Sequence, residues 1–221
     1  MHYKLFKAEN KLFASVYLKK LAVYTRKKRK VGDDMVKRRT LTREKVLTQA
    51  GRLIAERGID QLTIREVAAA LDVRPQSIYN YVSSLNELID QVGLRFVTDL
   101  ESRLLTQLVG LAGDQALMVF AQEMRRACHR QPNLACLLLD PHQLTTLNRT
   151  HAALVTLYQR LFTSLHLEEQ GQARSAAATL YRSAVFGFIV QELGGFLHGT
   201  PAQLDQRFDQ VLQLAIAQLP I

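Results

Sequence analysis

The stretch from Thr63 to Val82, TIREVAAALDVRPQSIYNYV, constrains the fold more than any other part of the chain. It holds two short helical patterns on either side of a brief interruption. Thr63 and Glu66 have the spacing of a capping box, in which each side chain accepts the other residue's backbone N–H. Pro75 suits the first position of the second helix, where no N–H donor is needed. The stretch therefore predicts a helix-turn-helix, with helices over about 63–71 and 75–81.

The second of these helices is too short to be stable alone, so neighbouring helices must hold it. Ile78 and Val82 are expected to face inward. The outer face carries side chains that can read base edges, since Arg suits guanine, Gln and Asn suit adenine, and Ser suits either. The candidates are Arg74, Gln76, Ser77, Tyr79, Asn80 and Tyr81. An ordinary helical hairpin is the alternative, and the combination of caps, Pro75 and exposed tyrosines disfavours it.

The remaining chain also favours helices, because it is rich in Leu, Ala, Gln and Arg and poor in alternating apolar runs. Caps are predicted at Thr42, at Ser84 with Glu87, and at Thr200 with Gln203. Further helices are expected over about 42–57, 84–107, 114–130, 144–165, 168–196 and 201–219, with a short one between Pro132 and Pro141. We predict an all-α protein with a three-helix domain over 41–88 and a helical domain over 89–221.

The first forty residues hold 13 Lys and Arg against 3 Asp and Glu, a charge of +10, and the rest of the chain contributes −1 to the net charge of +9. We expect a basic, disordered extension there. Such a segment suits nucleic acid or an anionic membrane surface. Lys37, Arg38 and Arg39 form a short arm next to the first helix. A different hypothesis is that translation naturally starts at Met35 and that residues 1–34 are upstream read-through. Mass spectrometry of the native N-terminus separates the two.

Several classes of protein are disfavoured by what the sequence lacks. Two cysteines and no long uncharged apolar run indicate a reducing compartment, a cytoplasmic location and no stable membrane association. No nucleophile with a partnered base and no Gly-rich phosphate loop stands out, so neither an enzyme nor a cofactor is expected. The spacing of Cys128, His129, Cys136 and His142 fits no metal-ligand pattern, and no metal is expected.

Over about Thr42–Leu88 the sequence resembles the tetracycline-repressor (TetR) family of bacterial transcription regulators. The resemblance is carried by AGRLIAERG, by Leu62–Ala68, by Val73–Val82 and by Ser84–Leu88. It implies an all-α homodimer with an N-terminal DNA-binding domain and a C-terminal ligand-binding and dimerisation domain. It also implies DNA contacts at Thr42, Arg43, Thr63, Gln76, Ser77, Tyr79 and Tyr81. Asp72 and Leu85 depart from the Gly and Lys that the family often has there.

The segment Ala184–Phe196 resembles the penultimate helix of one subgroup of the family. Each glycine inside a helix costs about 1 kcal/mol relative to Ala, which suits a site where another backbone packs closely. We therefore predict a dimer interface, with an intrachain core as the alternative for each residue. Its members are Gly187, Gly194, Gly195, Phe208, Val211, Leu212 and Ala215.

An effector pocket is predicted among the helices of the second half, and plain core is again the alternative. Its lining would be Leu104, Phe120, Met124, His151, Leu154, Tyr158, Phe162, Tyr181, Phe186 and Gln191. The apolar majority fits a small, largely apolar effector. His151 and Glu192 could anchor a polar group.

The sequence thus predicts a ligand-responsive DNA-binding regulator, of repressor type, whose partners are a double-stranded operator and a small effector. The alternative is a helical small-molecule-binding protein or enzyme with a vestigial DNA-binding hairpin. A salt titration of duplex binding distinguishes them, because several phosphate contacts per half-site give a steep salt dependence.

Overall fold

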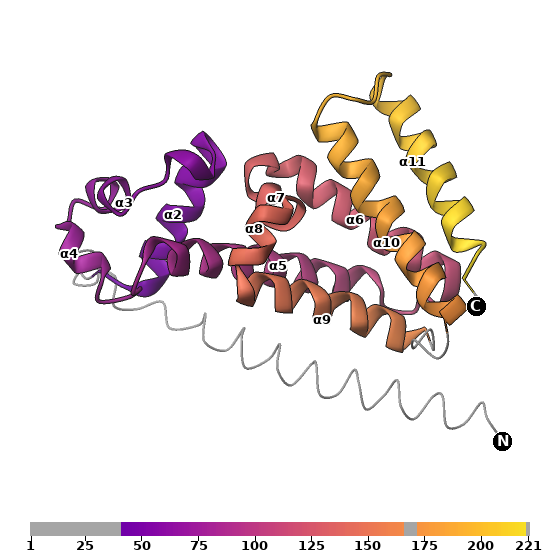
Figure 1. The fold of residues 1–221 in the computed structure, drawn as a ribbon, viewed down its shortest axis with the longest axis horizontal. Helices are drawn as coiled ribbons and strands as arrows, with labels where there is room; N and C mark the ends of the chain where they lie inside the picture. Colours follow the sequence, from indigo (N-terminus) through magenta and orange to yellow (C-terminus); the bar gives the residue numbers. More distant parts are fainter. Residues whose placement is uncertain (1–40, 166–171, 220–221) are drawn as a thin grey trace. The chain divides into compact units, whose positions relative to one another are not determined.

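The computed structural model describes residues 41–165 and 172–219, and their secondary structure is helical with no strand in these ranges. The predictions for residues 1–40, including Lys37, Arg38 and Arg39, lie outside the described residues. From Thr42 onward the chain forms one compact unit. Its elements (Figure 1) are α2 (Arg43–Arg57), η1 (Ile59–Gln61), α3 (Ile64–Ala70), α4 (Pro75–Ile78), α5 (Leu85–Gln107), α6 (Gly113–Arg130), α7 (Pro132–Leu139), α8 (Pro141–Thr146), α9 (Asn148–Ser164), α10 (Gln172–Leu193) and α11 (Pro201–Ile216).

The first helices begin and end where their caps predicted. The Thr42 hydroxyl accepts the N–H of Lys45, and Gly58 ends α2 with a φ of 84°. Thr63 and Glu66 form the reciprocal capping box at the start of α3. The apolar face holds Val46, Ala50, Leu53, Ile54, Ile64 and Val67, all buried. The helix at Pro75 is shorter than predicted, because α4 ends at Ile78 and a tighter turn continues to Val82.

The predicted capping box at the start of α5 is half right. The Ser84 hydroxyl accepts the N–H of Glu87 at 3.0 Å. The Glu87 carboxylate, however, accepts both the N–H and the hydroxyl of Ser83 at 2.6 Å, one residue earlier than predicted. Its other oxygen accepts from the Gln91 amide. The carboxylate therefore ties the loop before α5 to the first two turns of that helix.

The helix predicted over 144–165 is two helices, α8 and α9, separated at Leu147. The break is stabilised from a distant part of the chain. The Asp90 carboxylate of α5 accepts the backbone N–H groups of Arg149 and Thr150, at 3.1 Å and 2.9 Å. These N–H groups lie in the first turn of α9, where a helix has no internal partners for them. Asp90 therefore acts as the cap of α9.

The end of α10 corrects the prediction made for its glycines. The helix ends at Leu193, and Gly195 has a φ of 74°. The N–H of Phe196 bonds the carbonyl of Gln191, and that of Gly195 bonds the carbonyl of Glu192. This is a Schellman motif, which requires a left-handed residue after the helix. Gly194 and Gly195 therefore lie outside the helix, and the termination of the helix explains Gly195 without a partner chain.

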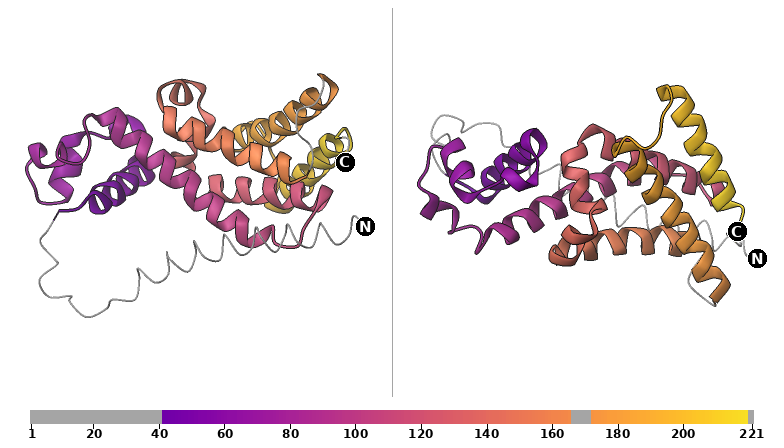
Figure 2. Two further views of the ribbon diagram at one scale, coloured as in Figure 1. Left: turned by 90° about the horizontal axis from the view of Figure 1, so that it is seen from below. Right: turned by 45° about the horizontal axis from the view of Figure 1, so that its top comes forward.

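Two helix pairs organise the second half of the molecule. Helix α5 packs along α9, and α10 packs along α11 (Figures 1 and 2). A Cβ placed on Gly93 of α5 would lie 2.4 Å from the Thr150 hydroxyl oxygen of α9. The close approach of these helices therefore depends on glycine at this position. No described helix is long and apolar enough to cross a membrane.

Candidate DNA interface and ligand-binding region

The residues predicted to contact DNA lie at the surface of α2, α3 and α4. Thr42, Arg43, Thr63, Arg74, Gln76, Tyr79 and Asn80 are exposed, and Ser77 and Tyr81 are partly exposed. Ile78 is fully buried and Val82 is 3% exposed, so this segment is anchored by its apolar side. The polar side chains of this segment therefore lie at the surface, on the side opposite Ile78 and Val82.

The turn between α3 and α4 contains Asp72, the residue that departs from the usual glycine. Asp72 has a φ of 54°, the left-handed conformation in which the family often has glycine. The N–H of Val73 bonds the carbonyl of Ala68, and the N–H of Asp72 bonds that of Ala69. These two bonds form a Schellman motif with Asp72 as its left-handed residue. Aspartate tolerates this conformation better than most residues, so the turn keeps its shape.

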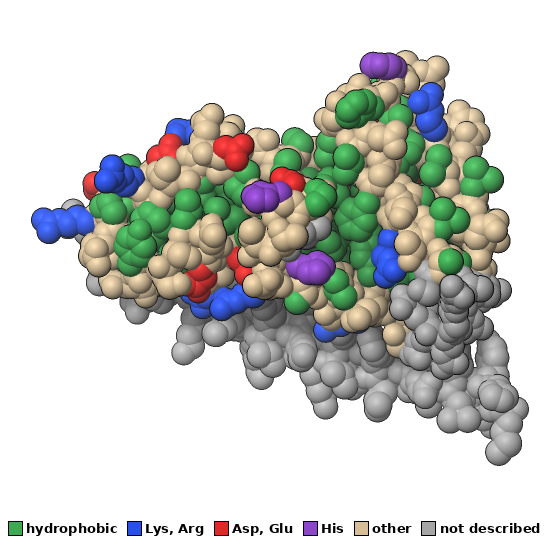
Figure 3. Space-filling model, viewed as in Figure 1, with side chains coloured by type: hydrophobic (Ala, Val, Ile, Leu, Met, Phe, Trp, Pro, Cys, Tyr) green, Lys and Arg blue, Asp and Glu red, His purple; other side chains and the backbone are tan. Residues whose placement is uncertain are grey.

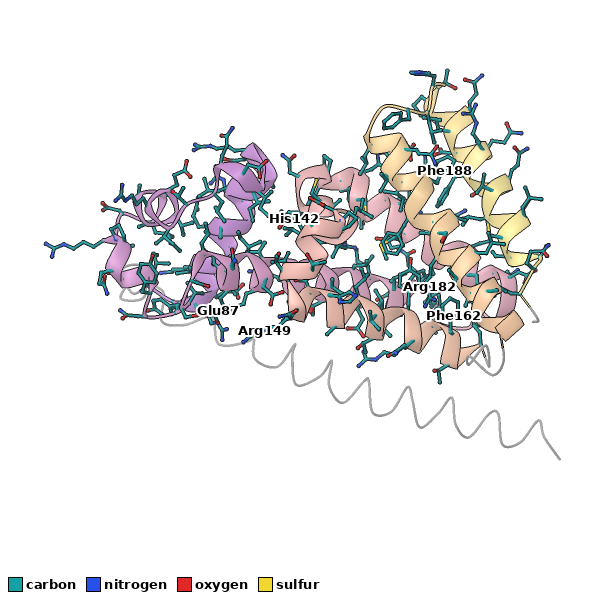
Figure 4. All side chains as sticks on the ribbon, in the orientation of Figure 1. Glu87, His142, Arg149, Phe162, Arg182 and Phe188 are labelled. Carbon is teal, nitrogen blue, oxygen red and sulfur yellow. The ribbon has the colours of Figure 1, made fainter. Side chains whose placement is uncertain are left out.

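A chain of hydrogen bonds joins the start of α2 to α5, and the sequence did not reveal it. Arg43 donates through Nε to the Gln91 amide oxygen at 2.9 Å. Gln91 in turn donates to Glu87 at 2.8 Å, and Glu87 accepts from Ser83. Hydrogen bonds from Ser83 lower the pKa of the Glu87 carboxyl below its ordinary value, with a smaller contribution from the charge of Arg149. Figure 4 labels Glu87 and Arg149 at this junction.

One turn of α5 therefore bonds to two different helices. Asp90 holds the N-terminus of α9, and the Thr150 hydroxyl bonds both the carboxylate and the carbonyl of Asp90 at 2.9 Å. The adjacent Gln91 holds Arg43 of α2. A displacement of α9 along α5 would act on the same turn that positions Arg43.

The residues predicted to line an effector pocket fall into two groups. Leu104, Phe120, Met124, Leu154, Tyr158, Phe162 and Tyr181 are buried, and Phe186 is partly exposed. His151 and Gln191 are exposed, because they lie on the outer sides of α9 and α10. These two residues therefore do not join the apolar group.

The apolar group contains an aromatic cluster, defined as Phe120, Tyr158, Phe162, Tyr181 and Phe186. The Tyr158 ring lies 5.0 Å from Phe120 and 5.6 Å from Phe186. The cluster joins α6, α9 and α10, and Figure 3 shows hydrophobic side chains gathered where α6 and α10 lie. Its composition suits an apolar or aromatic molecule.

The Glu192 carboxylate already has basic partners within the chain. Arg125 of α6 binds its carboxylate with two hydrogen bonds, at 2.6 Å and 2.7 Å. His129 lies 2.8 Å from the same carboxylate, and Arg125 also bonds Asp205 of α11. Burial alone would raise the pKa of Glu192, but the hydrogen bonds from Arg125 and His129 bring it below the ordinary value. This ion cluster joins α6, α10 and α11 and has a structural role.

A second carboxylate, Glu123 of α6, is also buried by its partners. It accepts from Arg103 and Gln107 of α5 and from Arg130, and it pairs with Arg126. Burial would raise its pKa, but the hydrogen bonds from Arg130 and Gln107 lower it overall. The cluster fixes α6 against α5.

The residues predicted for the dimer interface are also divided. Phe208, Leu212 and Ala215 of α11 are buried within the chain, so their side chains have no surface for a partner. Gly187 and Val211 are partly exposed, and Gly194 and Gly195 are exposed past the end of α10. Among the described residues of these helices, the large apolar side chains that are exposed are Leu180, Val190 and Leu214, and Phe196 beyond α10 is 75% exposed.

The described cysteines and histidines do not gather into one cluster. Within the described chain, no group of three or more His, Cys, Asp and Glu residues gathers as a metal site. Burial raises the pKa of the Cys128 thiol to about 12, and Cys136 is exposed.

The chain is similar in sequence to known bacterial regulators. The profile of bacterial regulatory proteins of the tetR family matches residues 46–92, from α2 into α5. An uncharacterized HTH-type transcriptional regulator from Mycobacterium tuberculosis is 30% identical over 182 residues, covering 79% of this chain and 80% of the relative.

Solved structures of regulators share the fold. The Bacillus subtilis regulator FadR, in complex with stearoyl-CoA, superposes with a TM-score of 0.61 at 13% identity, over 80% of this chain and all of that one. A transcriptional regulator from Saccharomonospora viridis, in complex with choline, gives 0.59 at 18% identity, over 77% and 95% of the two chains. A TetR-family regulator from Vibrio parahaemolyticus gives 0.57 at 19% identity, over 80% and 97%. At these identities the likeness concerns the fold.

Proposed function

Because the chain belongs to the TetR family of bacterial regulatory proteins, we propose that it represses transcription by binding an operator through α3 and α4. A small, largely apolar effector releases it. Residues 41–88 act as the DNA-binding domain, and the chain from residue 89 onward holds the effector and the dimer contacts. The observation that supports this most directly is α4, whose buried Ile78 leaves Gln76 and Tyr79 exposed.

The release mechanism follows from linkage. An effector that binds one conformer better than another must weaken DNA binding by the same factor by which DNA weakens effector binding. The turn of α5 at Glu87–Gln91 is bonded to both α9 and α2, so it is suited to carry this coupling. Asp90 transmits the position of α9, and Gln91 transmits it to Arg43.

DNA binding is tested with duplexes selected from a random pool by the full chain. Gln76→Ala should weaken binding to the selected duplex and relax the preference at one base pair, by about 1–3 kcal/mol. Gln115→Ala is the matched control, because Gln115 is exposed on α6, away from α4. Binding should also fall steeply with salt. Equal losses in both variants, or no selected sequence at all, would refute the assignment.

We also propose that two copies associate through α10 and α11. A stripe of α10 at helical spacing exposes Leu180 and Val190 on either side of Gly187, where an added Cβ would meet nothing within 4 Å. Leu214 of α11 is 72% exposed. A second copy would cover these apolar side chains.

Sedimentation velocity tests the dimer. Leu214→Glu should shift the protein towards monomer, because it places a charge on the proposed apolar contact. Val109→Glu is the control, since Val109 is exposed outside α10 and α11. A monomeric wild-type protein at micromolar concentration would contradict the proposal.

A further inference from the structure

The Tyr158 hydroxyl is the one buried side-chain polar atom without a hydrogen-bond partner in the described chain. Comparable buried groups are paired. The Tyr181 hydroxyl donates to the carbonyl of Leu117 at 2.7 Å, and Thr150 bonds Asp90. Leaving a buried donor unpaired is unfavourable, and native structures contain few such groups. The unpaired Tyr158 hydroxyl therefore suggests a hydrogen-bond partner from outside the chain.

The surroundings of Tyr158 define what that partner could be. Its ring packs against Phe120, Phe162 and Phe186, from three different helices. Burial raises the pKa of the Tyr158 hydroxyl, so it keeps its proton at neutral pH. It therefore offers one O–H donor inside an apolar cluster. An uncharged oxygen acceptor suits such a site, because an unpaired ion would be costly to bury.

The buried carboxylates of α6 and α10 have partners of their own. Glu192 is held by Arg125 and His129, and Glu123 is held by arginines of α5 and α6. The guanidinium of Arg182 lies 5.8 Å from the centre of the Phe162 ring. Figure 4 labels Arg182 and Phe162 close together on α10 and α9.

The cluster also has a side towards solvent. Phe186 is partly exposed, whereas Phe120, Tyr158 and Phe162 are at most 5% exposed. Phe186 is in direct ring contact with Tyr158. Phe186 is therefore the member of the cluster that joins the surface to the buried ring of Tyr158.

We propose that Tyr158 is the polar anchor of the effector site, donating its hydroxyl hydrogen to an uncharged carbonyl or ether oxygen of an otherwise apolar molecule. The inference rests on the proposed effector response and adds the chemistry of the ligand. Phe120, Phe162 and Phe186 hold the apolar body, and the single hydrogen bond sets its orientation. Ligands without the oxygen bind more weakly because the hydroxyl then stays unpaired.

The test uses two probes of similar shape, 2-acetylnaphthalene and 2-isopropylnaphthalene, titrated into the purified protein without DNA. The wild-type protein should prefer the ketone by roughly tenfold, the factor expected for one hydrogen bond in a dry site. Tyr158→Phe should abolish that preference and keep the affinity for the hydrocarbon. Thr156→Val is the control, because its hydroxyl lies on the same helix, outside the aromatic cluster, and already donates to the carbonyl of Ala152 at 2.8 Å. This variant should keep the preference.

Urea unfolding supplies an independent readout. Tyr158→Phe should leave the unfolding midpoint unchanged or raise it, since it removes an unpaired group, whereas Tyr181→Phe should lower it. A loss of stability in Tyr158→Phe equal to that in Tyr181→Phe would mean that a buried water already satisfies Tyr158, which overturns the proposal. The same conclusion follows if neither probe binds up to its solubility limit, or if Tyr158→Phe keeps the preference. Failure of DNA binding would refute the regulator function and leave the probe result standing.

Discussion

Replacing Gly93 with Ala is expected to destabilise the protein, although the same change usually strengthens a helix. The added Cβ would lie 2.4 Å from the Thr150 hydroxyl oxygen and 2.9 Å from its methyl carbon. Thr150 is fully buried and bonded to Asp90, so it cannot turn away without losing those bonds.

The magnitude follows from three contributions. Overpacking costs about 1–3 kcal/mol. A lost hydrogen bond between Thr150 and Asp90 costs about 1 kcal/mol. The higher helix propensity of Ala offsets about 1 kcal/mol of this loss. The expected net loss for Gly93→Ala is therefore about 1–3 kcal/mol in the free energy of unfolding.

Gly51→Ala in α2 is the matched control. There the new Cβ would make an ordinary contact at 3.6 Å with Val92, so only the helix propensity changes. Gly51→Ala should stabilise the protein by up to about 1 kcal/mol. The two substitutions are chemically identical and are expected to differ in sign.

Urea denaturation at one fixed protein concentration measures both variants. A double-mutant cycle then identifies the contact, because Thr150→Ala removes the two atoms nearest the new Cβ. The double variant of Gly93 and Thr150 should be more stable than the sum of the single losses predicts, by at least about 0.5 kcal/mol. A Gly93→Ala protein as stable as Gly51→Ala, or strictly additive losses, would refute this account of the α5–α9 contact.

Three further predictions concern caps, pH and thiols. Thr63→Ala should lower the free energy of unfolding by about 1 kcal/mol, since Glu66 loses its capping partner, and thermal melting at constant protein concentration measures this. The lowered pKa of Glu87 means that its contribution to stability is present above its ordinary pKa of 4.5 and is lost as the pH falls through the folded-state value. Unfolding midpoints of Glu87→Gln should therefore depend less on pH in the acid range, and an unchanged profile would contradict the hydrogen bonds from Ser83. A maleimide reagent should label exposed Cys136 in the folded protein and buried Cys128 only in urea; equal labelling rates without urea would contradict the burial of Cys128.

Features set by neighbouring residues were predictable from the sequence. The caps at Thr42, Thr63 and Thr200 depend on residues three positions away, and their pattern is visible in the chain. The apolar spacing in α2 and α3 likewise predicted which side chains are buried. The left-handed turn at Asp72 was expected from a departure in the motif and is present.

Features set by distant residues were not predictable in this way. The break between α8 and α9 depends on Asp90, about sixty residues earlier, and nothing near Leu147 signals it. The ion pair of Glu192 with Arg125 spans a similar distance in sequence, so the local sequence around Glu192 does not show that its carboxylate already has a partner. Gly195 was assigned to a helix because its role as a terminator depends on backbone bonds that composition does not show.

The bond from Arg43 to Gln91 sets a boundary for engineered chimeras. A graft that changes operator specificity would naturally transfer residues up to the loop before α5. Such a graft would separate Arg43 from Gln91, and Ser83 from Glu87, since each pair spans that junction. The transferred DNA-binding domain would then lose the hydrogen bonds that join it to α5 of the recipient protein. A junction after Gln91 keeps both pairs together, but it also transfers Asp90, which must then cap α9 of the recipient.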